Sequence, residues 1–176
     1  DPTPRFLGRV TLNPIPHIDP IGLILLFIAG FGWAKPVDVN PRNFRDGRRG
    51  MFVVSLAGAG ANIALGFVAW FFLLLLGELN LIGMVWQKTL WQLYRYNLMF
   101  AVFNLLPIPP LDGSKVLMSL LPGHLAYQYQ KIEPYGNYIL IALVLIPGLL
   151  STVVTPFYRI IEFVIRGLAS LILGIV

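Results

Sequence analysis

The chain has 176 residues, a formal net charge of +5 and no cysteine. Charged residues form only 12% of it and hydrophobic residues 57%, and its mean hydropathy is +0.75; soluble domains carry about 25% charged residues. This composition excludes a soluble globular domain, a disordered chain, a coiled coil and collagen, and the lack of cysteine excludes disulfides, thiolate metal sites and thiol nucleophiles. We therefore expect an integral, multi-pass protein of the cell membrane.

Long apolar stretches predict an all-α polytopic helix bundle, treated as a single transmembrane domain over 1–176. Because about 20 helical residues cross a bilayer, we predict spans at 50–77, 90–106 and 138–154, the last interrupted by Pro147 and a following glycine. The bundle would contain one helix broken by prolines, together with a short β hairpin or a re-entrant loop.

Two further apolar stretches are less suited to crossing alone. Residues 21–34 number 14, which suits a re-entrant or protein-covered helix. Residues 156–176 carry Arg159, Glu162 and Arg166, whose spacing of three and four places them on one helical face. This last segment is expected to lie partly in the membrane interface.

The basic residues lie beside the predicted spans, so membrane topology explains the charge better than nucleic acid, and no nucleic-acid partner is expected. Loop 35–49 contains five basic residues and two aspartates, whereas loop 78–89 contains one lysine and one glutamate. The positive-inside rule therefore predicts a cytoplasmic 35–49 loop, and its arginines could also contact anionic lipid. Alternating residues 37–40 predict a short strand before the Asn40–Pro41 turn.

The most informative segment is Asn104-Leu-Leu-Pro-Ile-Pro-Pro-Leu-Asp112-Gly113. Its prolines lack an N–H and end the preceding helix. Irregular backbone at membrane depth persists only inside protein or facing a water-filled cavity, and an unpaired carboxylate there is costly. Asp112 is therefore a candidate functional residue, although it could also cap a helix running from Gly113 to about Leu121.

This segment resembles the second signature of the site-2 protease family, the intramembrane zinc metalloproteases, here in minimal form without an inserted soluble domain. Asp1-Pro-Thr-Pro-Arg, Gly8-Arg-Val-Thr-Leu-Asn-Pro, Gly32-Trp-Ala-Lys-Pro-Val and Leu56-Ala-Gly are similar to further family segments, so the likeness covers about residues 1–115. It implies that Asp112 is a zinc ligand, that Asn104 stabilises the reacting carbonyl or holds substrate, and that a transmembrane protein segment is cleaved. Ala59 and Gly60 depart from the family's Leu-Ala-Gly-Pro-x-x-Asn.

The family's first signature, His-Glu-x-x-His, is absent from the sequence. It would supply two histidine ligands on one helical face and the glutamate that activates water, whereas His17 and His124 are 107 positions apart. Since the family places this signature shortly before the segment that matches Asp1, we expect a fragment rather than a pseudoprotease. Residues 1–176 alone are then expected neither to bind zinc tightly nor to cleave.

Four other residues have competing explanations. Asn62 follows a run of small residues that permits close helix packing, and it either packs or contacts substrate. His17 is a loop hydrogen-bonding residue or a ligand, and His124 is expected in a solvated loop. Asp19 before Pro20 predicts a helix N-cap.

Two other function classes stay open at this point. A non-catalytic membrane scaffold, or pseudoprotease, would keep the fold without the chemistry. A transporter would place broken helices at corresponding positions of both halves, and the sequence contains one strong break, at Pro107–Pro110.

Overall fold

The computed structural model describes residues 1–29 and 32–174. The chain divides into two compact units, 1–50 and 51–176, which are described separately. The described residues form helices and irregular segments, with no β-strand among them, which confirms the all-α prediction.

The first unit consists of short helices and turns. They are α1 (Thr3–Phe6), η1 (Ile15–His17), α2 (Pro20–Ala29) and η2 (Pro41–Asn43). Asp1 joins the two ends of the unit, because its carboxylate accepts hydrogen bonds from Asn40 N (2.9 Å) and Asn43 Nδ2 (2.6 Å). The predicted turn at Asn40–Pro41 is confirmed as η2, where Asn40 Oδ1 accepts from Arg42 N at 3.0 Å.

The predicted strand at 37–40 is wrong, and no hairpin is present in the described part of this unit. These residues are irregular and have no partner strand, and the amide of Asn40 donates to Asp1 instead. The unit contains one isolated antiparallel bridge, between Ile18 and Ala34, supported by a hydrogen bond from Lys35 N to His17 O at 2.8 Å.

Helix α2 begins as the sequence predicts. Asp19 Oδ1 accepts from Gly22 N at 2.9 Å, and Pro20 is the first helical residue, so the N-cap is confirmed. Its ten residues are too short to cross a bilayer. Phe27 and Ile28 are about 80% exposed, and the placement of residues 21–34 as a re-entrant or protein-covered helix stays a prediction.

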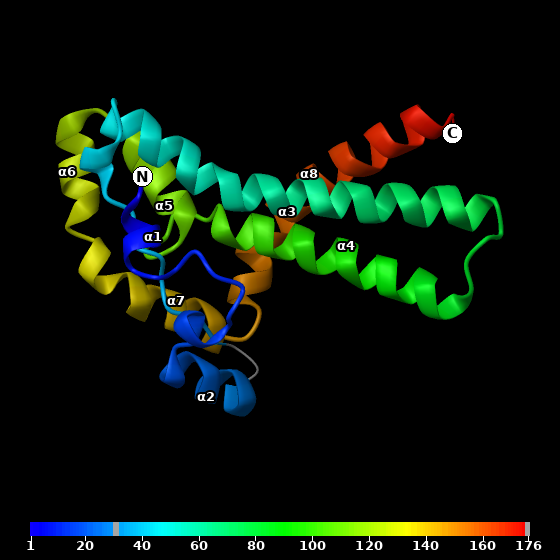
Figure 1. The fold of residues 1–176 in the computed structure, drawn as a ribbon, viewed down its shortest axis with the longest axis horizontal. Coiled ribbons are helices and arrows are strands. Elements are labelled where there is room, and N and C mark those ends of the chain that lie inside the picture. The colour runs from blue at the N-terminus through cyan, green and yellow to red at the C-terminus, as the bar shows by residue number, and fades with distance from the viewer. Residues whose placement is uncertain (30–31, 175–176) are drawn as a thin grey trace. The chain divides into compact units, whose positions relative to one another are not determined.

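The second unit is built on a long antiparallel hairpin of α3 (Gly47–Glu78) and α4 (Met84–Asn104), visible in Figure 1. Small residues of α3 let the two backbones approach, since Gly66 lies against the main chain of Tyr94 and Leu98. Trp70 then packs on Tyr94 with ring centroids 4.9 Å apart. Together with Ile165 and Ala169 of α8 (Leu149–Leu173), these residues form an apolar core.

The remaining helices fold back on the end of this hairpin. They are α5 (Asp112–Leu120), α6 (Gly123–Gln130), η3 (Glu133–Tyr135), α7 (Gly136–Leu145) and α8. A second core joins Val102 and Leu106 to Leu143 of α7 and Val154 of α8.

The interruption predicted at Pro147 within 138–154 is confirmed, but helix α8 runs across the predicted boundary between 154 and 156. The break falls at 146–148, where Pro147 cannot donate an N–H and Gly148 adopts a left-handed conformation (φ +81°). Helix α8 then continues through Pro156. The two helical segments on either side of the break meet at 92°.

In the part of the chain that the structure describes, α3 is long and apolar enough to cross a membrane by itself, which agrees with the span predicted at 50–77. The segments 123–145 and 149–173 meet the same criteria only if they are counted together as one broken span. Helix α4 covers the predicted span 90–106 but does not meet those criteria, so a multi-pass arrangement stays a prediction.

Candidate functional site: the proline loop and Asp112

The site is built on the loop 105–111 between α4 and α5. Helix α4 ends at Asn104, as the prolines predict, and the chain then makes two tight turns, with hydrogen bonds from Ile108 N to Leu106 O (2.8 Å) and from Leu111 N to Ile108 O (2.9 Å). The loop ends where Ser114 Oγ donates to Leu111 O at 2.7 Å.

Neighbouring elements fix this loop from two sides. Tyr129 of α6 donates from its hydroxyl to Pro107 O at 2.9 Å, and Gly136, at the start of α7, packs directly on the main chain of Pro109. The Pro109–Pro110 peptide is cis. Neither contact has a local sequence signal, which is why sequence reasoning missed Tyr129 and Gly136.

Gly113 brings the start of α5 onto the end of α4. A methyl group at this position would collide with the carbonyls of Leu105 and Leu106, so glycine is needed for this close approach. The backbone that carries Asp112 is therefore packed against the residues that follow Asn104.

Asp112 is the first residue of α5 and does not cap it. The N-cap is Leu111, and no side chain accepts a capping hydrogen bond, so the capping interpretation is wrong, although the helix ends at Leu120 about where predicted. The Asp112 side chain is 38% exposed and its Oδ1 lies 3.8 Å from Lys115 Nζ. Lys115 was missed, although its spacing of three from Asp112 on a helix is a usable signal.

The carboxylate of Asp112 faces α3. A methyl group at Gly58 would lie 3.8 Å from Asp112 Oδ2, with no other contact within 4 Å, so the missing side chain of Gly58 leaves room beside this oxygen. Desolvation raises the pKa of Asp112 above its ordinary value of 3.8, and the positive charge of Lys115 opposes this rise. Asp112 is thus a partly desolvated carboxylate with one distant cationic partner.

The two predicted asparagines lie on the helices beside this carboxylate. Asn104 is the last residue of α4, and Asn62 lies one helical turn beyond Gly58 on α3, in register with the buried residues Ser55, Ala59 and Gly66. Both side chains are partly exposed, and neither hydrogen-bonds to another residue in the described ranges. In particular, the Asn104 side chain makes no hydrogen bond to a neighbouring helix within residues 1–29 and 32–174.

The residues fit one zinc ligand rather than a complete site. A catalytic zinc ion takes three protein ligands, and within residues 1–29 and 32–174 no three His, Cys, Asp or Glu side chains lie close enough together to hold a metal. Asp112 has the chemistry of a single oxygen ligand, and its side chain is 38% exposed.

The other candidates do not join this site. His17 Nε2 lies 3.2 Å from Thr11 O, which agrees with a loop hydrogen-bonding role. The prediction for His124 is half wrong, because it is exposed but lies in the first turn of α6. Arg159, Glu162 and Arg166 share one face as predicted and line an open hollow on α8, where Arg166 pairs with Glu162 at 3.4 Å.

Comparison with known proteins places this site in context. Residues 78–147, which include Asn104 and Asp112, match peptidase family M50. The chain is 38% identical over 154 residues to "Putative zinc metalloprotease YwhC" of Bacillus subtilis (strain 168), covering 84% of this chain and 69% of that protein. It is 40% identical over 77 residues to "Stage IV sporulation protein FB" of the same strain, covering 44% of this chain and 24% of that protein. No solved structure matches the chain.

Proposed function

Because this chain belongs to peptidase family M50, the site-2 protease family, we propose that it forms part of an intramembrane zinc metalloprotease. The reaction is hydrolysis of a peptide bond in or near a transmembrane segment of a protein substrate. The observation that carries this proposal is the Asp112 carboxylate, which is not used to cap its helix, is 38% exposed and lies beside Gly58 of α3.

Asp112 supplies one oxygen ligand to the zinc ion. The other two protein ligands and the general base come from a His-Glu-x-x-His motif that is not among these 176 residues. Zinc, when bound, lowers the pKa of a water molecule toward about 7 and polarises the substrate carbonyl. The part played by this chain is to hold the carboxylate still, through the packing of Gly113 on α4.

The two asparagines act on the substrate. Asn104 donates a hydrogen bond from its amide to the oxygen that becomes negative as the carbonyl is attacked. Asn62 holds the substrate backbone beside α3, with its amide unpaired by the described residues. Both roles are supported by location, because Asn104 directly precedes the loop and Asn62 follows Gly58 by one turn.

We further propose that the protein is embedded in the cell membrane with loop 35–49 on the cytoplasmic side. Two observations support this proposal. Helix α3 is long and apolar enough to cross a membrane, and loop 35–49 carries exposed arginines, among them Arg42, Arg45 and Arg49. Membrane lipid is then a partner, and the transmembrane substrate approaches within the bilayer.

The competing functions make different predictions. A scaffold would keep Asp112 in place, but the intact protein would contain no His-Glu-x-x-His motif. The sequence of the intact gene product distinguishes a scaffold from a protease. A transporter would need broken helices in both halves of the chain, but the breaks at 105–111 and 146–148 both lie in the second half.

The decisive experiment uses the full-length protein reconstituted in lipid with a membrane-inserted peptide substrate. We expect Asp112→Ala to abolish cleavage and to remove bound zinc in metal analysis, and Asn104→Ala to lower the cleavage rate about 10²–10³-fold, as loss of one oxyanion donor does. The matched control is Glu133→Ala, which removes an exposed carboxylate of the same unit and should leave both measurements unchanged. Undiminished cleavage by Asp112→Ala would overturn the ligand assignment.

Residues 1–176 alone provide a second test. We expect this chain neither to retain zinc after dialysis nor to cleave the peptide, because Asp112 is a single ligand. Stoichiometric zinc on this chain would contradict the proposal that the other ligands lie elsewhere.

A further inference from the structure

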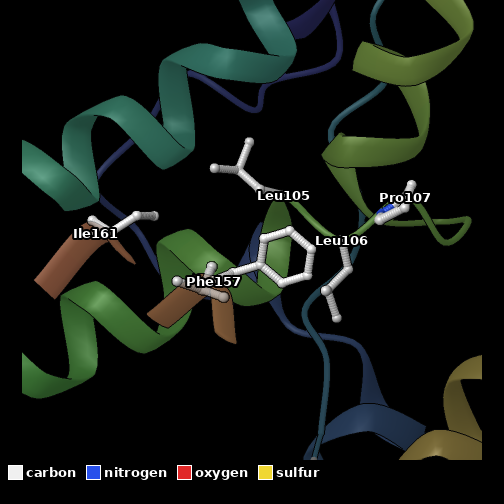
Figure 2. Close-up of a pocket in the computed structure, with 6 residues that line it drawn as sticks. Leu105, Leu106, Pro107, Phe157 and Ile161 are labelled. Atoms are coloured by element: carbon white, nitrogen blue, oxygen red, sulfur yellow. The ribbon is translucent and has the colours of Figure 1, made fainter. Parts of the chain in front are cut away.

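A small apolar cavity lies beside the proline loop (Figure 2). Its volume is about 60 Å³, and its walls are almost entirely hydrocarbon. It is lined by the end of α4, the start of the loop and one face of α8: Val102, Leu105, Leu106, Pro107, Phe157 and Ile161.

The cavity has a buried floor and an accessible rim. Val102 and Leu106 are at most 2% exposed, whereas Phe157 is 53% exposed and Pro107 is also exposed. Figure 2 shows the ring of Phe157 extending from α8 toward Leu106. A group from outside the chain can therefore enter past Phe157.

The wall of the cavity is formed by residues that adjoin the candidate site along the chain. Leu105 directly follows Asn104, and the carbonyls of Leu105 and Leu106 pack on Gly113, the residue after Asp112. The Tyr129–Pro107 hydrogen bond fixes the same stretch of backbone. The cavity wall and the proposed zinc ligand therefore belong to one tightly packed piece of the molecule.

We propose that this cavity is a specificity pocket that receives a branched aliphatic side chain (Val, Leu or Ile) of the substrate, next to the scissile bond. The inference rests on the proposed protease function and adds to it the class of side chain that is selected. An apolar occupant follows from the hydrocarbon walls, which offer no hydrogen-bond partner to a polar group.

Size restricts the occupant further. At about 60 Å³ the cavity is small, with room for a short side chain. The side chains of Val, Leu and Ile have three or four carbons and fit. Phenylalanine has seven side-chain carbons, so we expect it to be accepted less well.

The test measures kcat/KM for the reconstituted full-length protein on substrates that carry Ala, Val, Leu or Phe at each position flanking the cleaved bond. At one of these positions we expect Leu to exceed Ala by at least about tenfold, the usual effect of lost methylene groups in an apolar pocket, and Phe to be cleaved poorly. Phe157→Ala should enlarge the pocket and raise cleavage of the Phe substrate relative to the Leu substrate. Phe163→Ala, which removes an exposed ring of the same helix that does not line this cavity, should leave the preference unchanged.

A binding measurement separates failure of this pocket from failure of the protease function. Substrate carrying photo-leucine at the selected position, irradiated with the Asp112→Ala protein, should label the segment that contains Phe157 and Ile161. One outcome would overturn the pocket but not the protease function: cleavage depends on Asp112, labelling falls outside this segment, and no side chain is preferred. The cavity would then hold a lipid chain or stay empty. Labelling at Phe157 without any cleavage by the wild type would show that an aliphatic side chain enters the cavity, but it would overturn the protease function and with it the role of this cavity as a specificity pocket.

Discussion

The two units of the molecule are held together in different ways. In residues 1–50, side chains tie the loops together: the Asp1 carboxylate accepts four hydrogen bonds, from Thr3, Asn40 and Asn43. In residues 51–176, the polar side chains mostly bond within their own helix, as Asn97 does to Leu93 O. Glycines bring backbones into contact in both units, at Gly22 against Trp33 and at Gly113 against Leu105. We therefore expect the loss of an exposed polar group in the first unit to have a mild effect, and a methyl group added at a close backbone contact, such as Gly113, to have a strong one.

The largest effect is expected at Gly113. Gly113→Ala places a methyl group against the carbonyls of Leu105 and Leu106, which belong to backbone and cannot rotate away. Overpacking of this kind costs about 1–3 kcal/mol, and occasionally more, and we expect the upper end. Thermal unfolding of the chain in detergent micelles measures the change.

The matched control for this substitution is Gly60→Ala. Gly60 lies within α3 and has no neighbouring atom within 4 Å of the position of the new methyl group. Replacing a helical glycine by alanine there should stabilise the protein by about 0.5–1 kcal/mol. Equal destabilisation by both substitutions would show that backbone contact at Gly113 is not the cause.

A smaller, local effect is expected in the first unit. Asp1→Ala removes the acceptor that joins Thr3 to Asn40 and Asn43, but these groups are exposed and water replaces the lost bonds. We expect a loss of about 1 kcal/mol, seen as faster hydrogen exchange at the Asn40 amide. Asp38→Ala, at an exposed aspartate of the same unit, should leave that amide unchanged.

How much could be predicted from sequence follows the same division. Local polar signals in the first unit were read correctly: the N-cap at Asp19 and the turn at Asn40–Pro41 depend on residues two or three positions apart. The strand at 37–40 failed because alternation predicts a strand only when a partner strand exists. Asn40 instead contacts Asp1, 39 residues away, which no local pattern reveals.

In the second unit the sequence predicted where the chain breaks better than what meets at the break. Pro107 marked the end of α4, but the pairing of Pro147 with the left-handed Gly148 proved a stronger break than Pro156, which α8 tolerates. Asp112 was singled out by its place after the proline break and then by a family motif, whereas Asn104 was assigned through the motif alone. The contacts that hold them, such as Tyr129 to Pro107, join residues 22 positions apart and could not be predicted from spacing.

The smallest expected effect concerns the charge of Asp112, which should destabilise the fold at neutral pH. The pKa of Asp112 is 3.8 in the unfolded chain, and desolvation raises it in the folded protein. At a pH between the unfolded-state and folded-state pKa values, the folded protein binds more protons than the unfolded chain. The free energy of unfolding therefore falls as the pH rises through that interval. In the presence of a metal chelator, Asp112→Asn should have a higher Tm than the wild type at pH 7, and the difference should vanish below pH 3.8.

Lys115 tests the electrostatic part of this prediction. Its ammonium group lies 3.8 Å from the Asp112 carboxylate and lowers the pKa of that carboxylate. Lys115→Met should therefore lower the Tm of the wild type at pH 7. The same substitution should change the Tm of the Asp112→Asn protein less. If Asp112→Asn were less stable than the wild type at pH 7, the carboxylate would be a stabilising ion-pair partner. Its exposed position beside Gly58 would then have a structural cause, and the strongest physical argument for a ligand role at Asp112 would be lost.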